Sequence, residues 1–282
     1  MQRILYISWT DKMSGGEISV INYIKALRKQ NEEHFSPIVI CPQEGKLSQK
    51  LRKENIPFSI LSVSSFSFKK PWRFFLALEK LVSLIKREKI THIHNTSFYS
   101  NQLAVIAGKI CNIPVVTHGQ SFVTSKEIKR NLLSYADKLI VCSDAVKRNL
   151  LPYVNEDKIQ VLLHAIPIPK VKQKTFWLHK YLNIPKDYSL IGHTGLLEER
   201  KRQEDFIRAA ALVLQKNKKV CFLIIGNAQF NSRRYEESLH ELVRILHLEN
   251  YIFFLGFRED ITAILQELDI MALPSLHEPF SI

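Results

Sequence analysis

The sequence lacks the features of several common protein classes. It has only four cysteines in 282 residues, which form no CxxC pair: Cys41, Cys111, Cys142 and Cys221. Neither a disulfide framework nor a cysteine zinc site is indicated, and we expect reduced, buried thiols, as in a cytosolic protein. No apolar run approaches the roughly 18 residues of a membrane-spanning helix. The apolar N-terminal segment is short and is soon followed by the charged residues Asp11 and Lys12, so we interpret it as a first strand and not as a signal peptide.

Sequence motifs of other ligand-binding classes are also missing. There is no G-x-G-x-x-G fingerprint, and Cys41-Pro42 stands where a dinucleotide-binding domain places its acidic residue. This makes a nicotinamide-dependent dehydrogenase the weakest alternative. No metal-ligand spacing connects the histidines. No zinc finger or aromatic-interleaved basic motif favours nucleic acid.

Acidic residues are scarce in the first half of the chain. Residues 1–165 hold 24 Lys and Arg against 13 Asp and Glu, whereas residues 166–282 hold 16 against 14. The net charges of +11 and +2 predict that only the first half meets an anionic partner. A membrane surface or an anionic lipid carrier fits, and nucleic acid fits the charge but not the motifs.

Short apolar strand patterns alternate with helical patterns along the whole chain. The predicted strands cover Ile4–Trp9, Pro37–Cys41, Phe58–Val63, His92–His94, Pro114–Thr117, Lys138–Cys142, Ile159–Leu163, Ser189–His193, Val220–Ile225, Ile252–Gly256 and Ile270–Leu273. The predicted helices cover Glu17–Lys29, Leu47–Glu54, Trp72–Lys86, Gln102–Cys111, Glu127–Tyr135, Asp144–Leu151, Gln203–Gln215, Tyr235–Leu246 and Ile261–Leu268. Such alternation is typical of parallel sheets with helices on both faces.

A proline- and lysine-rich break near Ala165–Lys172 divides this alternation in two. We therefore expect an α/β protein of two Rossmann-like, doubly wound domains facing a cleft. The predicted bounds are 1–166 for the first domain, 167–187 for a linker and 188–282 for the second domain.

Two loops that leave predicted strands carry residues suited to an anion. Gly15-Gly16 precedes a helix, whose N-terminal amides can bind an anion, although a plain tight turn fits this pattern equally well. In the second domain, Arg200, Lys201 and Arg202 follow the strand ending at His193. Three cations there suit a diphosphate, although a lone basic cluster is more often a solvated loop.

Two other polar residues lie at predicted strand ends. His118 stands just past a buried strand, where it could contact a substrate or move a proton, and His94 lies at the preceding strand's edge. An isolated histidine of this kind is more often structural. Glu278 follows the last predicted strand, where open α/β sheets bind ligands, although a lone glutamate there is usually only exposed.

Taken in order, these motifs resemble the group 1 retaining glycosyltransferases of the GT-B fold. The resemblance covers nearly the whole chain, and its most specific part is the ending Leu273-Pro274-Ser275, then Glu278-Pro279-Phe280. It implies a nucleotide-sugar donor bound by the second domain and no metal or other cofactor. Donor-binding residues would be Gly16, Arg200, Lys201, Gly226 and Ser281.

The resemblance also implies roles in the reaction. Lys201 would neutralise the leaving diphosphate, and Glu278 would grip the donor sugar as the first carboxylate of the family's Glu-x7-Glu pair. His118 would face the reacting centre from the first domain.

The sequence departs from the family pattern at two places. Leu196 stands where the family often has arginine, and Arg200 and Arg202 are candidates to compensate. The second glutamate of the pair would fall four residues past Ile282, so we expect a C-terminally truncated member of the family.

An aromatic and basic stretch opens the helix predicted after Pro71. Residues 66–89 hold seven cations and two acids, and the residues assigned to acceptor or membrane contact are Lys69, Lys70, Trp72, Arg73 and His94. Aromatic residues beside lysines favour contact with an anionic membrane. An amphipathic helix packed on the sheet explains the same pattern, and the two interpretations can both be true.

The function that we expect is transfer of a sugar, with retention, from a nucleotide-diphosphate donor to a surface glycan or lipid-linked acceptor. Such an enzyme belongs to polysaccharide, lipopolysaccharide or capsule biosynthesis. We expect it in the cytoplasm, with peripheral contact to the inner face of the membrane as a further hypothesis. The alternatives are an inactive remnant that binds membrane or acceptor, and a nucleotide-sugar epimerase, against which the Glu278 motif argues.

Overall fold

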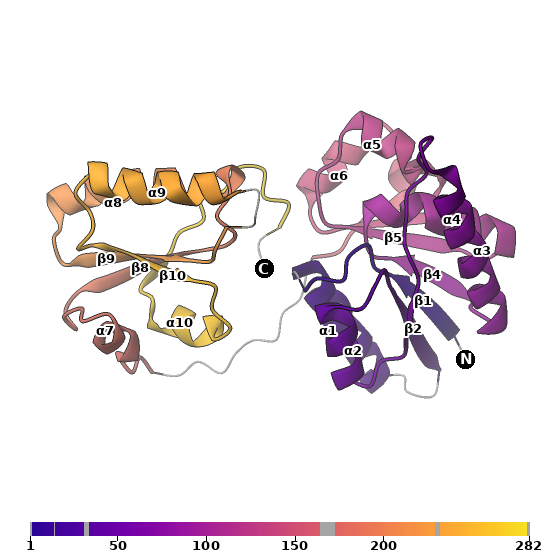
Figure 1. The fold of residues 1–282 in the computed structure, drawn as a ribbon, viewed down its shortest axis with the longest axis horizontal. Helices are drawn as coiled ribbons and strands as arrows, with labels where there is room; N and C mark the ends of the chain where they lie inside the picture. Colours follow the sequence, from indigo (N-terminus) through magenta and orange to yellow (C-terminus); the bar gives the residue numbers. More distant parts are fainter. Residues whose placement is uncertain (1, 14, 31–33, 164–172, 229–231, 281–282) are drawn as a thin grey trace. The chain divides into compact units, whose positions relative to one another are not determined.

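The computed structural model describes residues 2–13, 15–30, 34–163, 173–228 and 232–280. The chain divides into two compact units, Met1–Ile166 with Pro279–Ile282, and Pro167–Glu278. Each unit is a parallel sheet with helices on both faces (Figure 1). The predicted fold class, two Rossmann-like α/β domains, is therefore confirmed.

The first unit contains seven parallel strands in the order β3-β2-β1-β4-β5-β6-β7. They are β1 (Gln2–Ile7), β2 (Phe35–Cys41), β3 (Phe58–Ile60), β4 (His92–Asn95), β5 (Val115–Gly119), β6 (Lys138–Val141) and β7 (Ile159–Val161). Its helices are α1 (Gly15–Gln30), α2 (Lys46–Lys53), α3 (Pro71–Arg87), α4 (Asn101–Cys111), α5 (Ser125–Arg130) and α6 (Asp144–Leu150), with single 3-10 turns η1 (Phe98–Ser100), η2 (Leu133–Tyr135) and η3 (Glu156–Lys158).

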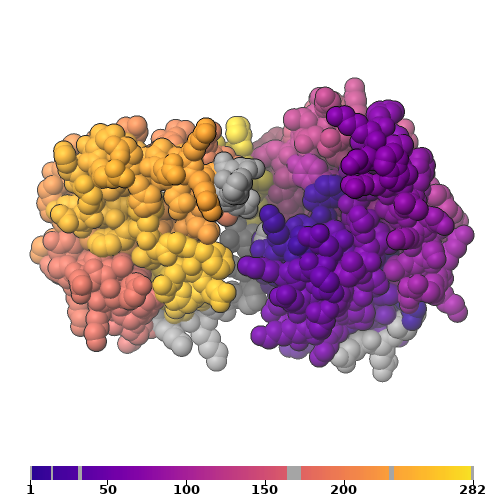
Figure 2. All heavy atoms as spheres, viewed as in Figure 1, coloured from indigo at the N-terminus to yellow at the C-terminus, as the bar shows by residue number. Residues whose placement is uncertain are grey.

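Side chains of successive strand residues point to opposite faces and build two cores. In β1, Leu5 and Ile7 join the core beneath α3 and α4, whereas Tyr6 joins the core beneath α1 and α2. Figure 2 shows that indigo and purple segments, which include α1 and α2, form much of the visible surface of this unit.

The second unit contains four parallel strands in the order β10-β9-β8-β11. Its elements are α7 (Trp177–Tyr181), β8 (Ser189–Thr194), η4 (Glu199–Lys201), α8 (Gln203–Lys216), β9 (Val220–Ile225), α9 (Arg233–Ile245), β10 (Ile252–Gly256), α10 (Ile261–Glu267) and β11 (Ile270–Met271). Helices α8 and α9 cover one face of the sheet, and α7 and α10 cover the other (Figure 1). The central strand β9 is buried on both faces.

Three expectations from the sequence differ from the structure. The helix expected at 127–135 ends at Arg130, because Leu132 adopts a left-handed backbone conformation, and η2 follows. Strands β3, β7 and β11, which lie at sheet edges, are shorter than expected. The linker expected at 167–187 is wrong for its second half: α7 lies there, and Leu178 and Ile184 are buried in the second unit's core.

The chain joins the second unit even before α7. Thr175 donates its backbone N–H to Glu267 at 2.8 Å, and Lys174 pairs with Asp269 at 2.5 Å. Residues 164–172, which include the two prolines, lie outside the described part of the chain. No helix among the described residues is long and apolar enough to cross a membrane.

The cysteines are all free, and three of the four are buried. Burial raises the pKa of the Cys41 thiol to about 12 and that of the Cys221 thiol to about 11. The expectation of buried thiols is confirmed for Cys41, Cys142 and Cys221 but not for Cys111, which is half-buried. The raised pKa values of Cys41 and Cys221 make them poor nucleophiles.

Candidate functional site

The carboxyl ends of β8 and β9 approach each other closely through two glycines. Gly195 and Gly226 have φ angles of +149° and +138°, a region that side chains rarely allow. A Cβ atom on Gly226 would lie 1.9 Å from the carbonyl oxygen of Gly195. Glycine at 226 therefore lets the loop after β8 cross over the end of β9, which leaves backbone exposed at the edge where α/β sheets bind ligands.

The loop after β8 presents the three predicted cations on a tight turn. Lys201 closes η4, and its side chain lies back over Gly195, so that a Cβ there would meet Lys201 Cε at 3.6 Å. Arg202 is held in a left-handed conformation by a bidentate pair with Asp205 at 2.7 and 3.0 Å. The Lys201 side chain therefore lies at the strand edge, whereas the Arg202 side chain contacts the first turn of α8.

Lys201 and Glu278 lie side by side at this edge. Lys201 Nζ is 2.5 Å from Glu278 Oε2, and the two side chains are 16% and 21% exposed. Arg200 lies 3.9 Å from the same oxygen and pairs with Glu198 at 2.7 Å. The sequence assigned Lys201, Arg200 and Glu278 to one site, and the structure brings all three together.

The loop that carries Glu278 is fixed to the cationic loop by the backbone. Leu276 donates its N–H to the Arg200 carbonyl at 2.8 Å, and Ala272 donates to Gly192 at 2.8 Å. Ser275 has a buried hydroxyl with no hydrogen-bond partner among the described residues. The site therefore combines fixed cations, one carboxylate and one unpaired hydroxyl.

His193 belongs to this site although sequence reasoning did not select it. It is fully buried in β8, and its Nδ1 donates to the Ala272 carbonyl at 3.0 Å. Burial lowers its pKa, and the nearby Lys201 charge lowers it further. A polar residue inside an apolar strand run was the signal that could have identified it.

A second polar group lies at the carboxyl edge of the first unit's sheet. His94 stacks on Tyr6 with ring centroids 4.9 Å apart, and the His118 ring lies 5.9 Å away. Burial lowers the pKa of His94 to about 4, so its ring is neutral near pH 7. His118 lies within β5 and is nearly buried, not just past the strand end as expected, because β5 extends to Gly119.

Gly16 lies in the first turn of α1, beside this histidine pair's sheet edge. A Cβ atom at Gly16 would come within 2.7 Å of Gln120 Oε1 in the segment that follows β5. The N-terminus of α1 therefore lies beside the side chain of Gln120.

Buried hydrogen bonds fix the strand ends beneath His94 and His118. Thr117 donates to Asn101 Oδ1 at 2.5 Å, and Asn95 donates to Thr117 Oγ1 at 3.3 Å. Asn101 in turn donates to the carbonyls of Asn131 and Leu132. These bonds join β4, β5 and α4 into one rigid support.

The remaining predicted residues lie elsewhere or outside the described chain. Lys69, Lys70, Trp72 and Arg73 are exposed where α3 begins. Ser281 is not among the described residues. In the part of the chain that the structure describes, no three His, Cys, Asp or Glu side chains are grouped to hold a metal ion.

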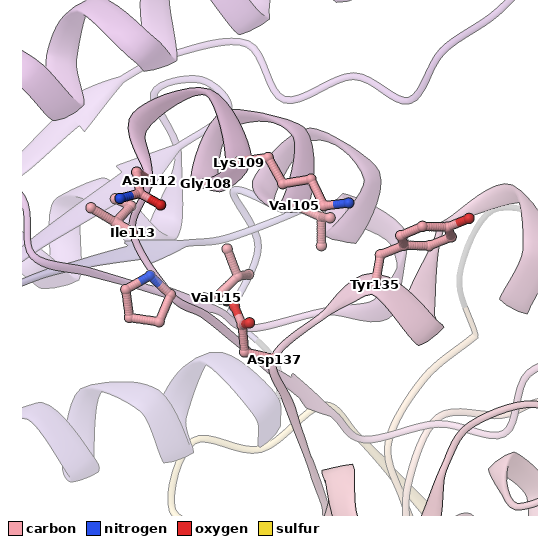
Figure 3. A pocket seen from close by; sticks show the side chains of 9 residues that line it. Val105, Gly108, Lys109, Asn112, Ile113, Val115, Tyr135 and Asp137 are labelled. Carbon is pink, nitrogen blue, oxygen red and sulfur yellow. Dashed lines mark hydrogen bonds between the residues drawn. The ribbon is translucent and has the colours of Figure 1, made fainter.

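A hollow of about 280 Å³ in the first unit contains none of the predicted site residues (Figure 3). It lies between the end of α4 and the beginnings of β5 and β6, so it is at the sheet edge opposite His94 and His118. Lys109 lies over the Tyr135 ring at 4.8 Å, and Asp137 accepts the Val115 N–H at 2.8 Å.

Comparisons with known proteins agree with this architecture. Residues 13–168 match the model of glycosyltransferase family 4, and residues 177–282 match that of glycosyl transferases group 1. The chain is 25% identical to the Escherichia coli UDP-Gal:alpha-D-GlcNAc-diphosphoundecaprenol alpha-1,3-galactosyltransferase, with 87% of this chain and 67% of the relative covered. It is 26% identical to the Campylobacter jejuni N,N'-diacetylbacillosaminyl-diphospho-undecaprenol alpha-1,3-N-acetylgalactosaminyltransferase, with 92% and 71% covered.

Solved structures share the fold. Anabaena HepE in complex with UDP and glucose superposes with a TM-score of 0.84 at 23% identity, over 100% of this chain and 76% of HepE.

Proposed function

The chain belongs to glycosyltransferase family 4, and from that premise we propose that it transfers a sugar from a nucleotide-diphosphate donor to a hydroxyl of a lipid-linked or surface glycan. The donor binds in the second unit, at the carboxyl end of β8. The reaction retains the configuration of the transferred sugar.

The adjacent Lys201 and Glu278 side chains carry this proposal. A nucleotide-sugar presents a diphosphate next to the hydroxyls of its sugar, so it needs a cation and a hydrogen-bond acceptor side by side. Lys201 Nζ supplies the cation and Glu278 the acceptor, 2.5 Å apart. As the sugar–phosphate bond breaks, negative charge grows on the diphosphate, and a fixed ammonium stabilises that charge. Arg200 supplies a second positive charge within reach.

The acceptor side of the reaction is assigned to the first unit. His118 contacts the reacting centre, and His94 contacts the acceptor. Because the His94 ring is neutral near pH 7, it hydrogen-bonds a hydroxyl without adding positive charge. Gly16 leaves the N-terminus of α1 free of a side chain, where its amides suit an anionic group.

The names of two relatives support a narrower proposal for the donor and the acceptor. The Escherichia coli relative is named for a UDP-galactose donor, and both relatives are named for diphosphoundecaprenol-linked acceptors. We therefore include a UDP-sugar donor and a polyprenyl diphosphate-linked acceptor in the proposal. An acceptor of this kind lies in a membrane, so we place the protein on the inner face of that membrane.

Titration of UDP against the wild type and Lys201→Ala tests the donor site. Loss of a charge-assisted hydrogen bond predicts about 10- to 100-fold weaker binding, with transfer of labelled sugar reduced at least as much. Lys219→Ala is the matched control, because Lys219 makes an exposed ion pair with Asp187 in the same unit. Equal UDP affinity in all three folded proteins would contradict the proposal and favour an inactive binding protein.

A further inference from the structure

Four large apolar side chains are exposed together where α3 begins. Phe68, Trp72, Phe75 and Leu76 are 92%, 55%, 57% and 52% exposed, and we name them the α3 apolar surface. They lie within nine residues of sequence, in the loop before α3 and its first turns. Apolar side chains that gather on a surface in this way mark a site of interaction.

The α3 apolar surface is held in place by the residues beneath it. The loop before α3 is fixed by the Phe66 N–H, which donates to Gln102 Oε1 at 2.9 Å, and by Ser65, which donates to the Tyr99 carbonyl at 3.2 Å. The Phe66 ring meets the rings of Phe68 and Phe75 edge-on, at 5.1 and 6.3 Å. The surface is therefore formed before any partner binds.

Cations alternate with the apolar residues. Lys69, Lys70 and Arg73 are exposed between Phe68 and Phe75, and residues 66–89 as a whole carry seven cations against two acids. A partner of this surface must therefore offer an apolar layer together with negative charge.

These requirements decide between classes of partner. If this surface bound a second copy of the chain, the net charge of +5 on residues 66–89 would face the same positive charge on the other copy. Nucleic acid offers the charge but no apolar layer deep enough for Phe68 and Leu76. A bilayer with anionic lipids offers both, because aromatic rings bind at the boundary of the acyl chains while neighbouring lysines reach the phosphates.

We propose that the α3 apolar surface and Lys69, Lys70 and Arg73 form a docking site for a membrane that contains anionic lipid. The site lies at the functional edge of the first unit: its loop is bonded to Tyr99 and Gln102, just past the end of β4 that carries His94. Docking therefore brings the edge that holds His94 and His118 toward the lipid headgroups. This orientation depends on the proposed lipid-linked acceptor, whereas the binding itself does not.

Co-sedimentation with vesicles of phosphatidylcholine, with and without 30% phosphatidylglycerol, tests the docking site. The variant Lys69→Glu/Lys70→Glu/Arg73→Glu should bind the anionic vesicles at least about 100-fold more weakly, since each cation near such a surface contributes about fivefold in affinity. Lys126→Glu/Lys129→Glu/Arg130→Glu is the matched control, because it changes three exposed cations of α5 in the same unit by the same charge. The control should keep most of its binding.

A second variant separates apolar contact from charge. Trp72→Ser/Phe75→Ser keeps every cation and removes two side chains that are more than half exposed, and its vesicle binding should fall about 10-fold or more. Lipids brominated on the acyl chain should quench the tryptophan fluorescence of the wild type more than that of Trp72→Phe, because Trp72 enters the bilayer.

Several results would overturn the docking site. These are equal losses in the α3 and α5 charge variants, unchanged binding of Trp72→Ser/Phe75→Ser, or self-association or RNA binding that disappears with the α3 variants while vesicle binding remains. UDP titration of the same preparations reports on the donor site, so failure of docking and failure of the proposed function are distinguishable.

Discussion

Lys201 Nζ and Glu278 Oε2 lie 2.5 Å apart at the carboxyl end of β8. A diphosphate that binds to Lys201 would share its three N–H donors with this carboxylate or replace the carboxylate at one of them. We therefore predict two effects of Glu278 on a nucleotide-sugar: it competes with the phosphates for Lys201, and it accepts hydrogen bonds from the sugar.

Glu278→Gln should separate these two effects. Removal of the negative charge frees Lys201, so binding of UDP alone should tighten by roughly 5-fold, as for a partly exposed ion pair. Sugar transfer should fall by about 10- to 100-fold, because a charge-assisted bond to the sugar is lost. Calorimetry with UDP and a transfer assay measure the two quantities. Weaker UDP binding by the variant would show that Glu278 positions Lys201 and does not compete for it.

Gly226→Ala should destabilise the second unit. The new Cβ would lie 1.9 Å from the Gly195 carbonyl oxygen at a φ of +138°, and such strain costs about 2 kcal/mol or more in unfolding free energy. Gly256→Ala is the control: its φ is also positive, at +64°, but no atom lies within 4 Å. Urea unfolding should show the larger loss for Gly226→Ala, and equal losses would contradict the close-approach argument.

The stability of the first unit should fall as pH decreases from about 6.5 to 4. Burial lowers the pKa of His94 from 6.5 to about 4 in the folded chain. Below pH 6.5 the unfolded chain therefore binds a proton that the folded chain does not, which favours unfolding. The loss reaches about 2 kcal/mol at pH 5.

His94→Phe tests this pH dependence, because phenylalanine keeps a ring beside Tyr6, Tyr23 and His118 but does not titrate. Its unfolding free energy should decrease less than that of the wild type between pH 7.5 and pH 5. Parallel pH profiles for the two proteins would show that His94 is protonated normally in the folded state.

Thr117→Val should weaken the support beneath the two histidines. Valine has the shape of threonine but cannot donate to Asn101 Oδ1, so a buried acceptor is left unpaired at a cost of about 1–3 kcal/mol. Thermal unfolding measures this loss. A stability equal to the wild type would mean that water replaces the hydroxyl.

The features predicted best from the sequence are those set by local pattern. A continuous apolar run located β9, whose six residues are all buried. Lys201 and Glu278 were placed together because a family motif relates residues that are far apart in sequence.

The failures came from tertiary contacts that no local pattern reveals. The polar His193 inside an apolar strand was a signal, but its bond to the Ala272 carbonyl and its nearness to Lys201, which tie it to the site, appear only in the structure. The prolines at 167 and 169 extended the expected linker too far, because Leu178 and Ile184 gain their burial only from strands that come later in the chain.

The strand order of the first sheet also has a consequence for biosynthesis. β1 lies inside the sheet, with β2 on one side and β4 on the other, and Ile4 is the neighbour of His92. While the nascent chain leaves the ribosome, one edge of this apolar strand remains open until β4 has emerged. Parallel pairing across such a separation is slow. Until then the open edge of β1 is a place where a chaperone can bind or another chain can pair.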